Sequence, residues 1–415
     1  MKRLSVILIA LSFALPEQSL LGQQGWYGQT SGTSNYLYWA NFPTPTTGWV
    51  VGQAGTILIT TNAGSLWSPQ VSNTTNFLYS VFFIDANTGW AVGQNGTIRK
   101  TTNAGADWLP QTSGTTNFLY STYFTDIERG IIVGSGGLIL KTTDGGTTWV
   151  SRPSPVTNTI STVSFPVSAT GLVGYAVGGS ASEGTILKTT DAGESWVQQA
   201  SGSASWLFGT YFTDFTTGWA VGFNGTIVAT TDGGATWAPQ TSGTTNRLVA
   251  THFVNQSTGW AVGYAGTILR TENGGSTWSQ QASPTTQNLW GVYFRDGLNG
   301  WAAGWNGTIL HTSTGGTAWI RSDESEAPTR FVLKQNFPNP FNPSTRISFI
   351  LPHSSPVTIK IYDLLGREVG TLVNGDEAPG RHEVVWDAAG MAGGVYFCRM
   401  QTGQFGESKR LLLLR

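Results

Sequence analysis

The hydrophobic positions of the chain fall into short apolar runs separated by turn residues. Residues 77–117 show the pattern: segments at 77–83, 90–93 and 97–101 alternate with turns rich in Asn, Asp and Gly, and Trp108 begins a fourth segment. Short runs of this kind, bounded by Gly and Asn, are typical of β-strands joined by tight turns. The pattern therefore predicts four short strands within one unit of 41 residues.

This four-strand unit repeats along most of the chain. A tryptophan recurs at intervals of 41, 41, 41, 47, 41, 41 and 41 residues, at positions 26, 67, 108, 149, 196, 237, 278 and 319. A second column reads Gly-Trp at Trp49, Trp90, Trp219, Trp260 and Trp301, and becomes Gly130-Ile131 and Gly174-Tyr175 in the other two units. Four strands per unit of this length are typical of propeller blades, so residues 23–321 are predicted to form an all-β, seven-bladed propeller. A parallel β-helix is the alternative, but its coils are usually shorter.

The N-terminal strand is expected to close the ring. Residues 26–32 match the Trp-x-x-Gln-Thr-Ser-Gly pattern that begins at Trp108 and Trp237, whereas residues 319–322 have lost the Gln. We expect residues 26–30 to join the last blade, because closure removes exposed strand edges that invite aggregation. Residues 319–322 are the alternative for this place.

The two ends of the chain have compositions of their own. Residues 1–22 are typical of a signal peptide, with Lys2 and Arg3 before an apolar run at 4–15 that is too short to span a bilayer. A buried N-terminal helix is the alternative. At the other end, the polar, acidic residues 322–330 read as a linker. The following segment, 331–415, predicts a small immunoglobulin-like β-sandwich with strands at 345–351, 357–362, 382–386, 394–400 and 408–414.

Charge and cysteine content exclude several classes of protein. The net charge is −1 with 11% charged residues, so no basic field exists for nucleic acid. The single cysteine, Cys398, excludes a disulfide framework, and the four histidines have no short metal-ligand spacing. We expect an exported, soluble monomer with no metal and no cofactor, in which Cys398 is a replaceable strand residue.

The turn before each repeating tryptophan carries a motif, which is Thr-Thr-Asp-Gly-Gly-Thr-Thr-Trp at 142–149. The acid recurs as Asp144, Asp191 and Asp232, and is replaced by Asn62, Asn103, Asn273 and Thr314. This motif resembles the Asp-box of bacterial-neuraminidase-type repeats. An Asp or Asn side chain accepts backbone N–H bonds within its own turn, and Gly supplies positive φ. Because catalysis needs one asymmetric site, similar copies of an acid favour a structural role.

The full repeat, Gly-Trp-Ala-Val-Gly-x-x-Gly-Thr-Ile-x-x-Thr-Thr-Asp-Gly-Gly-x-x-Trp, also resembles the photosystem II assembly and stability factor family over residues 26–321. That resemblance implies a seven-bladed propeller, exported to a lumenal compartment, that binds a membrane protein subunit.

The tail resembles a different family. Residues 336–343 read Asn-Phe-Pro-Asn-Pro-Phe-Asn-Pro, and with 357–369, 380–382, 393–397 and the pair Lys409-Arg410 they resemble the C-terminal sorting domain of type IX secretion. This resemblance implies passage through the outer membrane of a Bacteroidetes-like bacterium. There the translocon recognises the tail, and the passenger is released or attached to the cell surface. An ordinary immunoglobulin-like module is the alternative.

The arrangement of charged residues favours a binding protein over an enzyme. A sialidase-like site needs an arginine cluster, a tyrosine nucleophile activated by a glutamate, and an acid. Glu194 and Glu272 lie in Asp-box turns, away from the expected binding face, and no asymmetric set converges. A basic column on the third strands is either an anion-binding arc, or a set of partners for Asp-box carboxylates or of solvated edge residues; its members are Lys100, Lys141, Lys188, Arg270 and His311. We expect a non-enzymatic binding scaffold, with a glycan-processing hydrolase and an assembly-factor-like chaperone as alternatives.

Aligning the repeats locates a candidate ligand patch where the scaffold varies. Leucine repeats at the start of nearly every first strand, but the neighbouring positions differ between blades, and aromatic residues gather in the last three. Exposed aromatics beside one cation suit sugar faces or a peptide anchor. The predicted patch consists of Trp206, Phe223, Arg247, Tyr264, Trp290 and Trp305, and the alternative is that several of them are channel-lining core.

Overall fold

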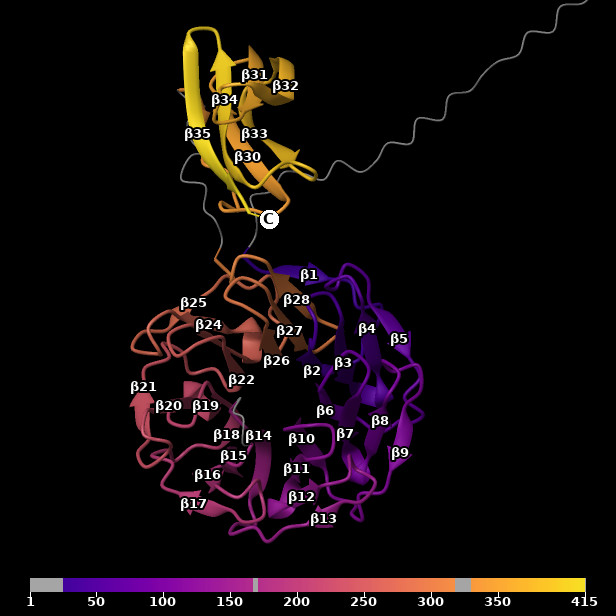
Figure 1. The fold of residues 1–415 in the computed structure, drawn as a ribbon. Coiled ribbons are helices and arrows are strands. Elements are labelled where there is room, and N and C mark those ends of the chain that lie inside the picture. Colours follow the sequence, from indigo (N-terminus) through magenta and orange to yellow (C-terminus); the bar gives the residue numbers. More distant parts are fainter. Residues whose placement is uncertain (1–24, 167–170, 318–329, 415) are drawn as a thin grey trace, which may run out of the picture. The chain divides into compact units, whose positions relative to one another are not determined.

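The computed structural model describes residues 25–166, 171–317 and 330–414, all in strands, turns and short 3-10 turns (Figure 1). Contacts divide the chain into two units, Met1–Trp319 and Ile320–Arg415. The predicted signal peptide, most of the predicted linker and the segment at 319–322 lie outside the described residues. Within the described part of the chain, no helix has the length and apolar character needed to cross a membrane.

Seven four-stranded antiparallel sheets form the propeller, which confirms the predicted fold (Figure 1). The first four blades are β2 (Leu37–Asn41), β3 (Gly48–Gly52), β4 (Ile57–Thr60) and β5 (Ser68–Gln70); β6 (Leu78–Phe83), β7 (Gly89–Gly93), β8 (Ile98–Thr101) and β9 (Leu109–Gln111); β10 (Leu119–Phe124), β11 (Gly130–Gly134), β12 (Ile139–Thr142) and β13 (Val150–Ser151); and β14 (Thr159–Ser164), β15 (Gly174–Ser180), β16 (Glu183–Thr189) and β17 (Val197–Gln199).

The last three blades follow the same order, with one exception at the outer edge of the seventh. They are β18 (Leu207–Phe212), β19 (Gly218–Gly222), β20 (Ile227–Thr230) and β21 (Ala238–Gln240); β22 (Leu248–Phe253), β23 (Gly259–Gly263), β24 (Ile268–Thr271) and β25 (Ser279–Gln280); and β26 (Leu289–Phe294), β27 (Gly300–Gly304), β28 (Ile309–Thr312) and the N-terminal β1 (Tyr27–Gln29). Five of the turns between second and third strands are 3-10 turns: η1 (Gln53–Gly55), η2 (Gln94–Gly96), η3 (Ser135–Gly137), η4 (Phe223–Gly225) and η5 (Tyr264–Gly266).

The N-terminal strand closes the ring, as predicted. β1 pairs antiparallel with β28, and Tyr27 lies opposite His311 in the register. Trp26 is buried against Phe294 of the last blade, and its indole Nε1 donates to Gln281 Oε1 at 2.8 Å. The first and last parts of the propeller are therefore joined within one sheet.

The Gly-Trp column packs each blade onto the next. Trp49 stacks on Phe83 of the following blade with ring centroids 3.6 Å apart, and Trp90 stacks on Phe124 at 3.5 Å. The glycine before the tryptophan is needed because the phenylalanine of the same blade covers it: a Cβ on Gly48 would lie 2.3 Å from the Phe42 ring. The motif is therefore a packing device.

The C-terminal unit is a small β-sandwich, also as predicted. One sheet has the order β29 (Val332–Leu333), β30 (Ser344–Leu351), β33 (Gly380–Asp387), and the other has β32 (Glu368–Glu377), β31 (Ser355–Tyr362), β34 (Gly394–Thr402), β35 (Phe405–Leu413). β29 and β32 were not among the predicted strands. Cys398 is buried in the core, and burial raises the pKa of its thiol to about 12, which suits a packing residue rather than a reactive thiol.

Candidate ligand-binding site at the propeller axis

Every innermost strand carries a β-bulge at the same place. In the first blade the register shifts between Leu37 and Trp39, so Tyr38 is the extra residue, and the other six blades repeat the shift. Bulges re-aim a side chain relative to the regular pleat. All seven bulge residues line one cavity of about 370 Å³: Tyr38, Tyr79, Tyr120, Ser161, Phe208, Val249 and Trp290. A cavity lined by all seven innermost strands lies on the propeller axis, and we call it the axial cavity.

The floor of the axial cavity is shared with a second cavity of about 410 Å³, formed further along the same strands. The residues common to both are Trp39, Ser80, Ser121 and Thr162. The remaining blades have Gly209, Ala250 and Gly291 in the same column, so Trp39 is the one large side chain at this level. At Gly291 a Cβ would lie 2.7 Å from the Tyr38 carbonyl oxygen, which shows how closely the innermost strands approach there.

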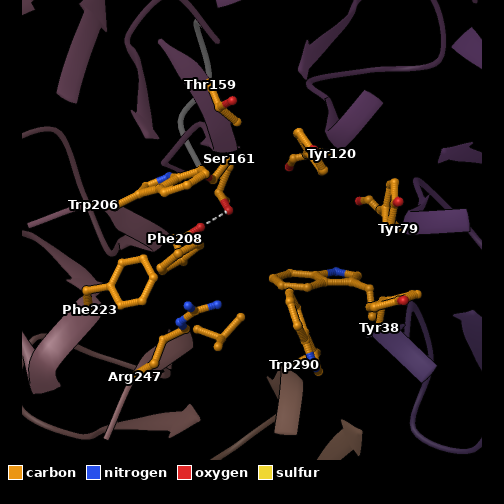
Figure 2. A pocket seen from close by; sticks show the side chains of 15 residues that line it. Tyr38, Tyr79, Tyr120, Thr159, Ser161, Trp206, Phe208, Phe223, Arg247 and Trp290 are labelled. Atoms are coloured by element: carbon orange, nitrogen blue, oxygen red, sulfur yellow. Dashed lines mark hydrogen bonds between the residues drawn. The ribbon is translucent and has the colours of Figure 1, made fainter. Parts of the chain in front are cut away.

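Arg247 is held against aromatic rings on one side of the axial cavity (Figure 2). Its guanidinium carbon lies 3.8 Å from the centroid of the Phe223 ring, 4.5 Å from that of Tyr264 and 5.0 Å from that of Phe208. Its Nη1 donates to the Tyr264 hydroxyl at 2.8 Å, while its buried Nε has no hydrogen-bond partner. Burial lowers the pKa of Arg247, but an arginine stays protonated at ordinary pH. The cation is thus fixed in place and only partly hydrogen-bonded.

Three tyrosines form the opposite side of the cavity, as Figure 2 shows. The rings of Tyr38 and Tyr79 lie 5.1 Å apart, and those of Tyr79 and Tyr120 lie 5.2 Å apart. Burial raises the pKa of all three phenols, so they remain neutral hydroxyls at physiological pH. The site therefore combines one cation, several aromatic faces and an arc of neutral hydroxyls.

Comparison with known families accounts for both units of the chain. The family model described as photosynthesis system II assembly factor YCF48 matches residues 19–112, 103–202, 201–280 and 241–329. The chain belongs to the YCF48 family. The model described as secretion system C-terminal sorting domain matches residues 335–413, so the sandwich of this YCF48-family chain is a type IX sorting domain, which implies export to the cell surface or secretion. No curated protein matches the chain.

Solved structures share the fold of this YCF48-family chain at low sequence identity. YCF48 from Cyanidioschyzon merolae is 20% identical with a TM-score of 0.59, over 69% of this chain and 98% of that one. YCF48 bound to D1 peptide is 21% identical with a TM-score of 0.60, over 71% and 98%. PorZ, a surface component of the type IX secretion system of Porphyromonas gingivalis, is 13% identical with a TM-score of 0.53, over 92% and 60%.

The YCF48-family propeller brings all six residues of the predicted patch together. Trp206, Phe223, Arg247 and Trp290 line the axial cavity. Tyr264 lies behind Arg247, its ring centroid 6.0 Å from that of Trp290 and 6.1 Å from that of Trp305, and Trp305 stacks on Tyr36 at 4.8 Å. All six side chains are half-buried, and the four that line the axial cavity occupy the channel-lining place that the alternative named. Their role in ligand binding stays a prediction.

Sequence reasoning did not select the other eleven residues that line the cavity. Six of them belong to the variable first-strand column from which only Trp290 was selected for the patch: Tyr38, Tyr79, Tyr120, Ser161, Phe208 and Val249. Thr159 begins the innermost strand of blade four, and the shared floor consists of Trp39, Ser80, Ser121 and Thr162. The missing signal was the bulge, which places this entire column against the axial cavity.

The Asp-box acids accept hydrogen bonds within their own turns. Asp144 Oδ1 accepts from the Thr148 backbone N–H at 2.9 Å and from Thr142 Oγ1 at 2.8 Å. Hydrogen bonds from Thr148, first the backbone and then the side chain, lower the pKa of Asp144. Asn273 makes the same backbone bond, to Thr277, without a charge. These contacts are those of the structural role predicted for the motif.

The basic column is occupied by contacts with Asp-box turns. Lys100 Nζ donates to the Gly145 carbonyl at 2.8 Å, Lys188 Nζ donates to the Gly233 carbonyl at 2.7 Å, and Lys141 pairs with Glu194 at 2.7 Å. The expected partners were Asp-box carboxylates, but the lysines bind turn carbonyls and a neighbouring glutamate instead, since the Asp oxygens are already used within their turns. The three lysines therefore link neighbouring blades, while Arg270 pairs with Glu272 at 2.8 Å and His311 contacts Tyr27 within its own sheet.

Proposed function

We propose that this chain is a non-enzymatic binding protein, secreted or displayed on the cell surface, that holds its ligand in the axial cavity. The observation that carries the proposal is the contrast between two columns of the innermost strands. The leucine column repeats to build the core, while the adjacent bulge column differs between blades and lines the cavity. Variation at the bulge column adds nothing to a repeating scaffold, but it gives a ring an asymmetric recognition surface.

The chemistry of the cavity supports binding rather than hydrolysis. Glycoside hydrolysis generally uses two carboxyl groups that flank the scissile bond. In the part of the chain that the structure describes, the residues lining the axial cavity include no Asp, Glu or His, and its aromatic rings and one guanidinium are typical anchors for a ligand. Glu194 is paired with Lys141 and Arg152 far from these residues, in an Asp-box turn.

Relatives suggest what kind of ligand to test. One solved YCF48 structure is bound to a D1 peptide, which makes a peptide one ligand class for this propeller. The aromatic faces suit a sugar equally well. The secretion machinery is the first partner of the chain, through the sorting domain, and export then places the axial cavity outside the cell, where either ligand class is available.

An array that carries both glycans and peptides tests the proposal with the full chain. We expect at least one class to bind, and we expect the double variant Tyr264→Ala with Trp290→Ala to lose that binding. Leu109→Ala is the matched control, because Leu109 is an exposed apolar residue of β9 at the outer edge of its blade. Binding that survives the double variant, or hydrolysis of an arrayed glycan, contradicts the proposal.

A further inference from the structure

Charge gives the first constraint on the ligand of the axial cavity. Of the residues that the structure describes, Arg247 is the only charged one that lines it. Among the described residues no carboxylate pairs with Arg247; its side-chain hydrogen bond goes to the Tyr264 hydroxyl, and its Nε is buried without a partner. A fixed guanidinium of this kind is completed by an anion that accepts its free N–H groups.

The number of positive charges favours a carboxylate over a phosphate. Phosphate sites usually combine several cations, or backbone N–H groups of a glycine-rich turn at a helix N-terminus. The described residues that line the axial cavity include one cation and no glycine. One guanidinium balances the single negative charge of a carboxylate.

The wall away from Arg247 is made of hydroxyl groups. Tyr79, Tyr120 and Thr159 lie across the cavity from Arg247 in Figure 2, and Ser161 lies between them and Trp206. Each hydroxyl both donates and accepts hydrogen bonds, because burial keeps the tyrosines protonated. This wall suits a ligand that itself carries several hydroxyl groups.

The volume and the walls of the axial cavity limit the size of the group that it can bind. The cavity holds about 370 Å³, near the lower end of the range of about 300–1,000 Å³ that is typical of small-molecule pockets. Trp39 lies at its floor, where the second cavity begins. A pocket of this size admits one terminal unit of a polymer rather than a folded surface, and its aromatic walls offer faces against which a sugar ring stacks.

We propose that the axial cavity binds the terminal acidic sugar of a glycan, a hexuronate whose carboxylate pairs with Arg247 and whose hydroxyls bond to the tyrosine side. This inference rests on the proposed binding function. A peptide C-terminus with an apolar last residue satisfies Arg247 equally well, but it offers no hydrogen-bond partner to Tyr120 and Thr159, which costs binding free energy. Ser161 already accepts a hydrogen bond from Trp206 Nε1 at 3.0 Å.

Calorimetric titration of the full chain tests the inference with four classes of compound. These are galacturonate and glucuronate trisaccharides, their methyl esters, neutral galactose and glucose trisaccharides, and a tripeptide with a free C-terminal carboxylate and a terminal leucine. We expect at least one uronate to bind ten-fold or more tightly than its own ester, the neutral sugars and the tripeptide. Equal binding of acid and ester, or preference for the tripeptide, overturns the inference.

Variants separate a specific contact from loss of the fold. Arg247→Gln should weaken uronate binding at least ten-fold, and Arg247→Lys should weaken it less, because Lys keeps the charge but not the planar group. Arg295→Gln is the matched control: Arg295 lies at the second cavity, and its substitution should leave uronate binding unchanged. Each variant is first shown to unfold at the same temperature as the wild type.

The outcomes distinguish this inference from the proposed function. If no uronate binds but the array yields another ligand that needs Tyr264 and Trp290, the acidic-sugar inference is wrong and the binding function stands. If neither the uronates nor the array yields a ligand, both are wrong.

Discussion

The indole ring of Trp301 in the last blade stacks on the phenyl ring of Phe42 in the first, with centroids 3.8 Å apart and planes inclined by 17°. The same relationship joins Trp219 to Phe253 and Trp260 to Phe294 between earlier blades. Trp301 and Phe42 are separated by nearly the whole propeller in sequence, so this contact is a second closure of the ring, in addition to the pairing of β1 with β28.

Trp301→Ala should destabilise the propeller by about 3–5 kcal/mol, since it removes a fully buried aromatic side chain from a packed interface. Trp301→Tyr should cost much less, because Tyr175 occupies the same column in blade four and stacks on Phe212 at 3.6 Å. The midpoint of urea unfolding measures both effects. Trp305→Ala is the control, because Trp305 is half-buried. If all three variants lose the same free energy of unfolding, the contact between Trp301 and Phe42 makes no special contribution to ring closure.

The Asp-box predicts a difference between two substitutions of one residue. Asp144→Ala should lower stability by about 1 kcal/mol, because the turn loses the acceptor of the Thr148 and Thr142 hydrogen bonds. Asp144→Asn should be nearly neutral, since Asn103 and Asn273 already serve in the same turn. Thermal unfolding checks the pair, with ligand binding measured in parallel. A stable Ala variant that has lost ligand binding gives Asp144 a functional role instead.

Low pH should destabilise the propeller through the Asp-box acids. Although desolvation opposes it, hydrogen bonds from Ser195 and Thr189 lower the pKa of Asp191 to about 2, and hydrogen bonds from Thr236 lower that of Asp232 to about 2. A folded-state pKa below the unfolded value of about 3.9 means that the stabilisation is complete above that pH and is lost as the pH falls towards 2.

The unfolding temperature should therefore be constant between pH 5 and 7 and fall below about pH 4. A variant with Asn at positions 144, 191 and 232 should show a shallower fall, with wild-type stability at pH 7. A fall of equal steepness in wild type and variant assigns the acid sensitivity to other groups, such as Asp214 and Asp296, whose pKa values are also lowered despite desolvation.

Much of the fold could be predicted because its determinants are local and repeated. The Gly-Trp column, the Asp-box turn and the spacing of 41 residues each recur, so an error in one unit is corrected by the others. Strand β32 was missed because all but one of its ten residues are exposed or half-buried, and Gly370 and Gly375 lie inside it. A polar edge strand lacks the apolar alternation that a sequence pattern needs.

The site was only partly predictable because a bulge depends on backbone register. In a regular strand, Tyr38 and Trp39 would point to opposite faces, yet both line the axial cavity. No residue type at the bulge is shared by all seven blades, since Tyr38, Ser161, Val249 and Trp290 all occupy it. The aromatic residues near Arg247 could be found by their variation, but the tyrosines opposite could not be placed without the register.

Trp39→Ser should join the two axial cavities. It gives blade one the small residue that Ser80 and Ser121 supply in blades two and three, and it removes the one bulky side chain at the shared floor. A crystal structure of the variant should show one continuous passage, and any ligand that rests on the floor should bind more weakly. If Tyr38 or Trp290 moves in to fill the space, the floor does not depend on Trp39.

Deleting residues 331–415 should strand the propeller in the periplasm of a host that has a type IX secretion system, because the sorting domain is the part of the chain that the machinery recognises. Immunoblots of periplasmic, surface and medium fractions measure the distribution. A matched fusion places the same tail on an unrelated exported protein, which should then reach the surface or the medium. The truncated protein must also show the thermal unfolding transition of the propeller, so that retention is not caused by misfolding. Delivery of a folded, truncated propeller to the surface or the medium refutes the sorting role, and failure of the fusion to leave the periplasm shows that the tail alone is insufficient.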